Sequence, residues 1–170
     1  MEPKNLKLKL ENIIKESSGK NEYCVEELKI SDFLILRYKK SDYGNLLRIK
    51  YTNASIDYTT KTQNFIYSKF KDITYLDLCC NNLYYLPETV CDLHNLKELI
   101  IADNRLEALP ENIGHLKNLW HINAEKNKIK ELPDSMKNIK SLVELNLLNN
   151  ELSFISENIM SIESLTRIFI

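Results

Sequence analysis

The sequence repeats itself every 23 residues from residue 73 onward, and this period constrains the fold more than any other feature. The shared pattern is LxxLxLxxNxLxxLPxxIxxLxx, in which related apolar residues replace some of the leucines. Four copies occupy residues 73–95, 96–118, 119–141 and 142–164, and a partial copy occupies 165–170. A single unit of this size cannot bury its own apolar residues, whereas stacked units form one continuous core. The period therefore predicts a solenoid.

Each part of the repeat predicts a part of one coil. The LxxLxL segment is expected to form a short strand, and successive strands pair as a parallel sheet on the concave side. The Leu-Pro pair and the residues after it predict short helical or 3₁₀ turns on the convex side, with Ser156 in place of proline in the fourth copy. The asparagine after each strand can bond backbone groups of the turn and link neighbouring coils. These ladder residues are Asn81, Asn104, Asn127 and Asn150.

This pattern resembles the leucine-rich-repeat superfamily, in its intracellular 23-residue subclass with LPxxIxxL on the convex side. That subclass includes Ras-pathway scaffolds, plant intracellular repeats, and bacterial and viral proteins. The resemblance covers residues 62–170 and implies an α/β solenoid. It implies binding of other macromolecules rather than a particular reaction, because one repeat fold serves many functions.

Residues 1–61 carry no family motif, and we interpret them as a small α+β cap or a separate module. Residues 5–17 have helical apolar spacing, although alternating leucines at the start of this segment also fit a strand. Residues 33–38 and 46–51 predict two strands of a hairpin. A half repeat at 62–72 continues the register backwards, and we expect residues 62–70 to form a convex turn that closes the first coil.

Composition restricts the partner and the compartment. Residues 1–70 carry 13 Lys and Arg against 9 Asp and Glu, whereas residues 71–170 carry 10 against 15. The acidic repeats argue against nucleic-acid binding, which needs clustered cations. We see no signal peptide and no apolar run of the roughly 18 residues that a membrane span needs, so we expect no membrane association. The four cysteines do not form the cysteine-rich caps of secreted repeat proteins, which favours a cytoplasmic protein with reduced thiols.

The reactive residues do not form a recognisable catalytic or metal site. Cys79, Cys80, Cys91 and His94 have a spacing that superficially resembles a zinc site. The repeat register, however, places the first two on the concave side and the last two outside the convex side of the core. His121 faces the concave sheet without a nucleophile or a substrate pocket beside it. We therefore expect no enzyme activity, no metal and no cofactor.

The residues between the strand leucines predict the binding face, because side chains alternate along a strand. One row is Tyr75, Glu98, His121, Glu144 and Arg167, and the next is Asp77, Ile100, Asn123, Asn146 and Phe169. The third row is Cys79, Ala102, Glu125 and Leu148, and beside it lie Cys80, Asp103, Lys126 and Asn149.

Acidic and large apolar residues of these rows, with the polar residues between them, are our candidates for partner contacts. The acidic residues would steer a basic partner to the sheet, and the apolar residues would serve as anchors. Trp120 lies beside them at the edge of the sheet. The alternative is that the charges only keep an exposed sheet soluble. The predicted contact residues are Tyr75, Asp77, Glu98, Ile100, Asp103, His121, Asn123, Glu125, Glu144, Asn146, Leu148 and Phe169.

The sequence therefore favours an intracellular adaptor or regulator that binds a protein partner on its concave face. A second hypothesis places an effector activity in residues 1–60, with the repeats as a targeting device. A third is self-assembly through the strand at 165–170, because an open sheet edge can pair with another chain.

Overall fold

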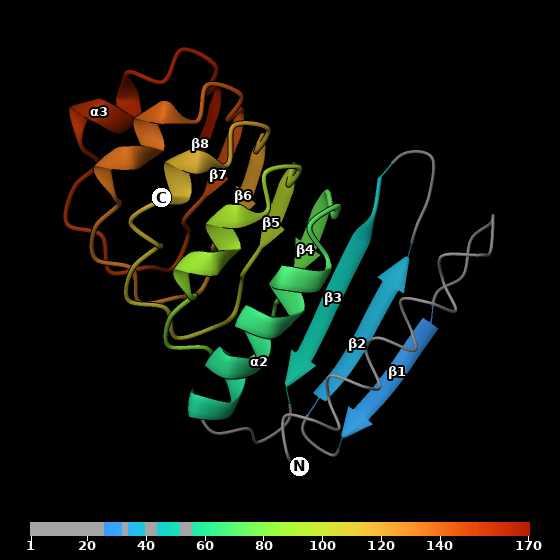
Figure 1. The fold of residues 1–170 in the computed structure, drawn as a ribbon. Helices are drawn as coiled ribbons and strands as arrows, with labels where there is room; N and C mark the ends of the chain where they lie inside the picture. Colours follow the sequence, from blue (N-terminus) through green and yellow to red (C-terminus); the bar gives the residue numbers. More distant parts are fainter. Residues whose placement is uncertain (1–25, 32–33, 40–43, 52–55) are drawn as a thin grey trace.

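The computed structural model describes residues 26–31, 34–39, 44–51 and 56–170, and the helix predicted at 5–17 lies outside them. The described strands form one eight-stranded sheet in sequential order (Figure 1). The strands are β1 (Glu26–Ser31), β2 (Leu34–Lys39), β3 (Leu46–Tyr51), β4 (Tyr75–Asp77), β5 (Glu98–Ile100), β6 (His121–Asn123), β7 (Glu144–Asn146) and β8 (Arg167–Phe169).

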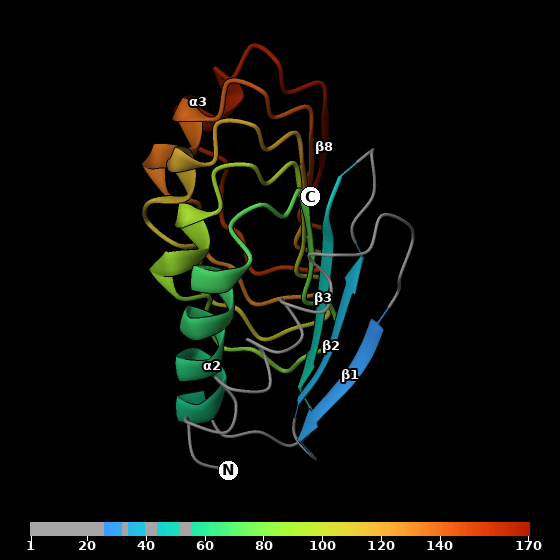
Figure 2. The same ribbon diagram turned by 45° about the vertical axis from the view of Figure 1, so that its right-hand side comes forward.

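The helices lie on the opposite side of the coils from the sheet (Figure 2). They are α2 (Ile56–Lys69), η1 (Glu88–Asp92), η2 (Ile113–His115), η3 (Asp134–Asn138) and α3 (Glu157–Met160), where η marks a 3₁₀ helix. From β3 to β8 all neighbouring strands are parallel, as expected when each returns through a convex segment. The predicted α/β solenoid is thus confirmed.

The first three strands extend the sheet of the repeats. β1 pairs with β2 and β2 with β3 in antiparallel fashion, so the predicted hairpin is confirmed at 34–39 and 46–51. Alternation along β3 buries Leu47, Ile49 and Tyr51 in the core. β3 then pairs in parallel with β4. The sheet therefore continues across residue 62, where we place the start of the solenoid, and that domain boundary stays a prediction.

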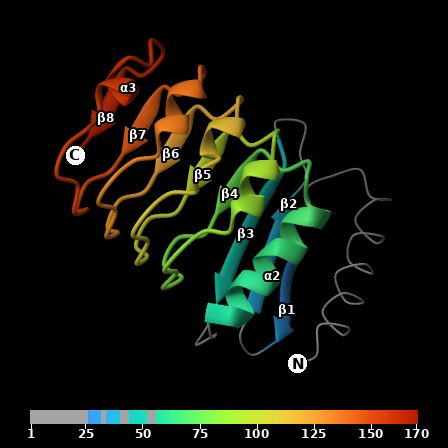
Figure 3. The same cartoon turned by 60° about the vertical axis from the view of Figure 1, so that its left-hand side comes forward.

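The segment between β3 and β4 is an α-helix of 14 residues rather than the short turn we expected at 62–70. α2 lies on the convex side next to η1, so the expected position is right although the conformation differs (Figure 3). It buries Ile66 and Tyr67 against the first coil, followed by Phe70. This segment has no Leu-Pro pair to interrupt a helix, and one helix thus packs on the convex side of the first coil.

The core is a column of aliphatic side chains that runs through all coils. The central residues of the repeat strands, Leu76, Leu99, Ile122 and Leu145, are fully buried. Full burial of one such side chain contributes about 1.5–3 kcal/mol. Ile168 of β8 is only partly buried, because no further described coil covers it.

The predicted asparagine ladder is present and joins the repeats to β3. The Asn81 amide donates to the carbonyls of Ile49 and Leu78 and accepts the backbone N–H of Tyr51. Asn104, Asn127 and Asn150 make the corresponding bonds one coil further on, so each amide holds its own turn and the coil before it. The ladder therefore fixes the stacking of the strands that carry the concave face.

Candidate functional site: the concave face of the sheet

The strand register brings the predicted rows together as expected. Tyr75, Glu98, His121, Glu144 and Arg167 are successive cross-strand neighbours, and so are Asp77, Ile100, Asn123, Asn146 and Phe169. The middle residue of each repeat strand points into the core, which leaves these two rows on the other face of the sheet. We call the outward side of β2–β8 the concave face.

In the first row, the acids Glu98 and Glu144 lie next to His121 and Arg167. His121 Nδ1 lies 3.6 Å from a Glu98 carboxylate oxygen, and its Nε2 lies 3.6 Å from Glu144. The other Glu144 carboxylate oxygen forms an ion pair with Arg167 Nη2 at 2.8 Å. The Trp120 ring packs beside the His121 ring at 5.4 Å between centroids. The row thus presents partly neutralised acids next to an aromatic surface.

Asp77 does not occupy the exposed position that we expected. Its side chain is buried, at 3% exposure, and Arg48 of β3 holds it with Nε and Nη2 each 2.6 Å from Oδ2. The other oxygen accepts the backbone N–H of Cys79 at 2.9 Å. Asp77 raises the pKa of the Arg48 guanidinium, as a close opposite charge should. Asp77 therefore organises the strand end instead of displaying a free charge, and our expectation of its exposure is wrong.

Asn123 and Asn146 have the same local role as Asp77 in later coils. The Asn123 side-chain oxygen accepts the backbone N–H of Glu125 at 3.1 Å, and Asn146 accepts that of Leu148 at 3.1 Å. A short polar side chain that bonds two residues ahead stabilises the turn that follows a strand. These two amides therefore shape the face, and their contact with a partner stays a prediction.

The third and fourth rows lie where the chain turns away from the strands. Cys80, Asp103, Lys126 and Asn149 all have positive φ, between 54° and 58°. This left-handed conformation is unfavourable for most residues, and here it recurs at one position of every turn. Asp103 is exposed and accepts a hydrogen bond from the Cys80 thiol at 3.3 Å. Glu125 pairs with Lys126 at 3.5 Å.

Large apolar side chains are exposed on and beside this face. Trp120, Leu148 and Phe169 are 36%, 38% and 42% exposed, whereas Tyr75 and Ile100 are half-buried. Burial raises the pKa of the Tyr75 hydroxyl, and the negative charges of Asp77 and Glu98 raise it further. The hydroxyl therefore stays protonated and can donate a hydrogen bond. The face thus combines apolar anchors with polar groups.

Cations of the hairpin strands, which we did not assign to this face, change its charge distribution. Arg37 of β2 is the direct neighbour of Arg48 of β3, and Lys39 is the neighbour of Leu46, which begins the first row. Lys50 donates to the Cys80 carbonyl. The face therefore carries cations over β2 and β3, where Asp77 offsets the charge of Arg48, and acidic residues over β5–β7. The alternation of residues 46–51 indicates that Arg48 and Lys50 point to the same side of their strand. Only the pairing of β3 with β4 shows that this side belongs to the concave face.

Our argument against a zinc site placed Cys91 outside the convex side of the core, and this placement is wrong. Cys91 is buried, at 2% exposure, rather than outside the convex side of the core, because η1 turns its side chain inward. Burial raises the pKa of the Cys91 and Cys79 thiols to about 12. In the described part of the chain, no cluster of three or more His, Cys, Asp or Glu side chains could hold a metal ion.

Among the described residues, no helix is long and apolar enough to span a bilayer.

Comparison with known proteins identifies the family. A family profile described as a leucine-rich repeat region matches residues 47–170. The chain belongs to the leucine-rich-repeat family. The match begins in β3, in agreement with the hydrogen bonds that join β3 to the first asparagine. Leucine-rich-repeat solenoids are protein-interaction modules whose curved sheets serve as binding surfaces.

Two solved structures of such repeats resemble the chain. A leucine-rich-repeat protein from Leptospira interrogans is 28% identical, with a TM-score of 0.55, over 71% of this chain and 29% of that protein. An internalin from Listeria monocytogenes is 18% identical, with a TM-score of 0.55, over 61% of this chain and 29% of the internalin, and it shows the fold alone. The chain thus spans less than a third of the length of either protein. No curated protein matches it significantly.

Proposed function

We propose that this protein is a non-enzymatic intracellular adaptor or regulator that holds a protein partner on its concave face. The exposure of Trp120, Leu148 and Phe169 on and beside a rigid, charged sheet supports this proposal most directly. Isolated exposed apolar residues are common, but aromatic and aliphatic anchors beside polar groups are typical of interface centres. The adjacent unpaired cysteines Cys79 and Cys80 fit a reducing compartment.

The distribution of charge indicates how a partner would be oriented. The acidic residues of β5–β7 would attract a basic surface, and the cations of β2 and β3 would attract an acidic one. Complementary charges mainly raise the association rate and fix the orientation, while buried apolar contacts supply most of the affinity. We therefore expect a partner with separate basic and acidic areas, and the basic area should lie over Glu98 and Glu125.

Charge reversal on the two faces tests this assignment. The concave variant carries Glu98→Lys and Glu125→Lys, which leave the Glu144–Arg167 pair intact. The control variant carries Asp92→Lys and Glu163→Lys, two exposed acids outside the strands, and has the same change in net charge. Both variants and the unchanged chain are used to capture proteins from the native cell type, and Kd is then measured for the purified partner.

We expect the concave variant to lose the partner and the control variant to keep it. Circular dichroism and a thermal scan would first establish that all three proteins are folded. Equal binding by all three would refute the concave face as the binding site. It would direct attention to an effector activity in residues 1–60 or to self-assembly through the edge strand β8, and both of these roles stay predictions.

A further inference from the structure

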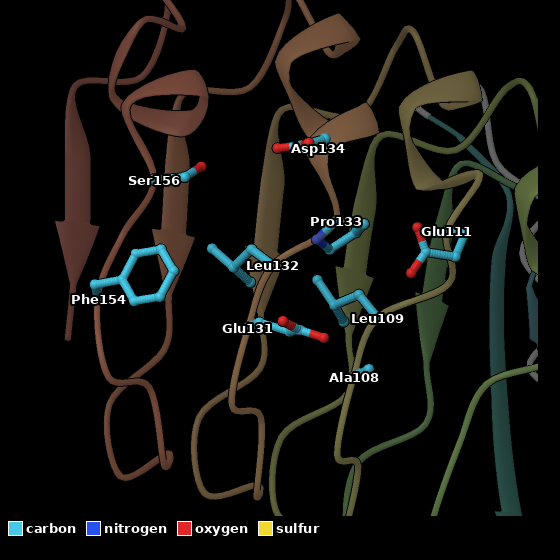
Figure 4. A pocket seen from close by; sticks show the side chains of 9 residues that line it. All are labelled: Ala108, Leu109, Glu111, Glu131, Leu132, Pro133, Asp134, Phe154 and Ser156. Carbon is cyan, nitrogen blue, oxygen red and sulfur yellow. The ribbon is translucent and has the colours of Figure 1, made fainter.

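A groove lies on the flank of the solenoid, away from the concave face. It has a volume of about 300 Å³ and crosses three successive coils between their asparagine turns and their convex helices. Figure 4 shows its lining side chains, with Leu109 and Leu132 between Phe154 and Glu111. The lining residues are Ala108, Leu109, Glu111, Glu131, Leu132, Pro133, Asp134, Phe154 and Ser156.

The repeat register explains why the groove forms here. Tyr85, Ala108, Glu131 and Phe154 occupy the same position in four successive coils, and alanine is the smallest of them. The short side chain leaves space above the apolar residues Leu109 and Leu132, which form the base of the groove. Phe154 forms one wall and is 69% exposed. At this exposure the phenyl ring is accessible from solvent.

The charge of the groove is strongly one-sided. Three carboxylates line it, and none of its lining residues is a lysine or an arginine. Asp134 already accepts a hydrogen bond from the Asn158 amide at 2.9 Å. Within the described part of the chain, the carboxylates of Glu111 and Glu131 make no hydrogen bond or ion pair. Lys130, the cation next to Glu131 in sequence, is paired with Glu107 at 3.8 Å.

We propose that this groove binds an arginine side chain from a basic segment of a protein partner. The methylenes of the arginine would cover Leu109 and Leu132, and its guanidinium would lie against the Phe154 ring and the Glu131 carboxylate. Arginine fits better than lysine because its guanidinium is planar, is less strongly hydrated, and stacks on aromatic rings while it bonds a carboxylate. This site is separate from the concave face, and it could be absent while the proposed function there holds.

Nuclear magnetic resonance of the full chain can test the groove with a defined probe. The probe is the blocked peptide Gly-Ser-Arg-Ser-Gly, titrated into the 15N-labelled protein. A matched peptide with citrulline keeps the shape of arginine and lacks its charge. We expect the arginine peptide to shift backbone signals around Leu132 and Phe154 with a Kd in the millimolar range, roughly what one side chain provides. The citrulline peptide should bind at least about fivefold more weakly.

Variants separate the two contacts and exclude an indirect effect. Glu131→Gln and Phe154→Ala alter exposed side chains, so both proteins should stay folded, and each should weaken the arginine peptide by about three- to tenfold. Glu125→Gln on the concave face is the control and should leave the groove shifts unchanged.

Three results would overturn the proposal. One is equal binding of the citrulline and arginine peptides. Another is a set of shifts confined to the concave face. The third is a concentration-dependent shift at Phe154 without peptide, which would mean that a second copy of the chain covers the groove.

Discussion

Replacement of Asn104 by alanine should destabilise the protein more than any other single change in the asparagine ladder. Its side-chain oxygen accepts the backbone N–H groups of Asn81 and Leu83, at 3.1 and 2.9 Å. Its amide donates to the carbonyls of Leu78 and Ile101, which also receive the amides of Asn81 and Asn127. The variant therefore leaves two buried N–H groups without an acceptor, whereas both carbonyls keep a donor.

The contacts set the size of the effect. An unsatisfied buried polar group costs about 1–3 kcal/mol, so two N–H groups give about 2–6 kcal/mol for Asn104→Ala. The side-chain oxygen of Asn150 accepts a single N–H, from Ile129, and the residue is only half-buried. Asn150→Ala should therefore cost about 1–3 kcal/mol. Asn118 is exposed and donates one hydrogen bond to the His94 carbonyl, so Asn118→Ala should cost less than about 1 kcal/mol.

Urea unfolding followed by circular dichroism measures this order. Repeat proteins can unfold in parts, so the slopes of the three variants must agree with that of the unchanged chain before their free energies are compared. The reasoning is refuted if Asn104→Ala costs no more than Asn150→Ala. It is also refuted if the Asn118 control loses as much stability as either ladder variant.

Three further changes test local features. Ser156 has nearly the backbone angles of Pro87 and an unbonded, buried hydroxyl, so Ser156→Pro should stabilise the protein by about 0.4–1 kcal/mol in the same urea assay; a loss of stability would contradict this. A Cβ on Gly114 would clash with the backbone carbonyl oxygen of Ser135, so Gly114→Ala should lower stability by about 1–3 kcal/mol; an unchanged midpoint would count against it. Burial raises the pKa of Cys91 to about 12, so the unfolded chain releases this proton first and stability should fall as pH rises from about 8.5 towards 12. Cys91→Val should reduce that slope in unfolding measured across this pH range, and an unaltered slope would assign it to other groups.

Much of the fold was predictable because the repeat converts sequence spacing into position. Once the 23-residue period is recognised, each residue has a defined place in the coil. The buried leucines, the strand rows and the four ladder asparagines followed from that period and from the alternation of side chains along a strand. The hairpin at the start of the sheet followed from local alternation as well. These features depend on neighbours in the same segment or on an identical copy one period away.

Tertiary structure alone decided the features that join unlike segments. From its position in the repeat, Asp77 was expected to be an exposed acid. The pairing of β3 with β4 places Arg48 against it instead. The same pairing placed cations on one part of the concave face. The groove beside Phe154 required three coils to stack with Ala108 between larger residues. In each case the partner residue lies outside the repeat or in a copy that departs from it. Periodicity specifies where a residue lies within its coil, but packing determines the charge, shape and burial that surround it.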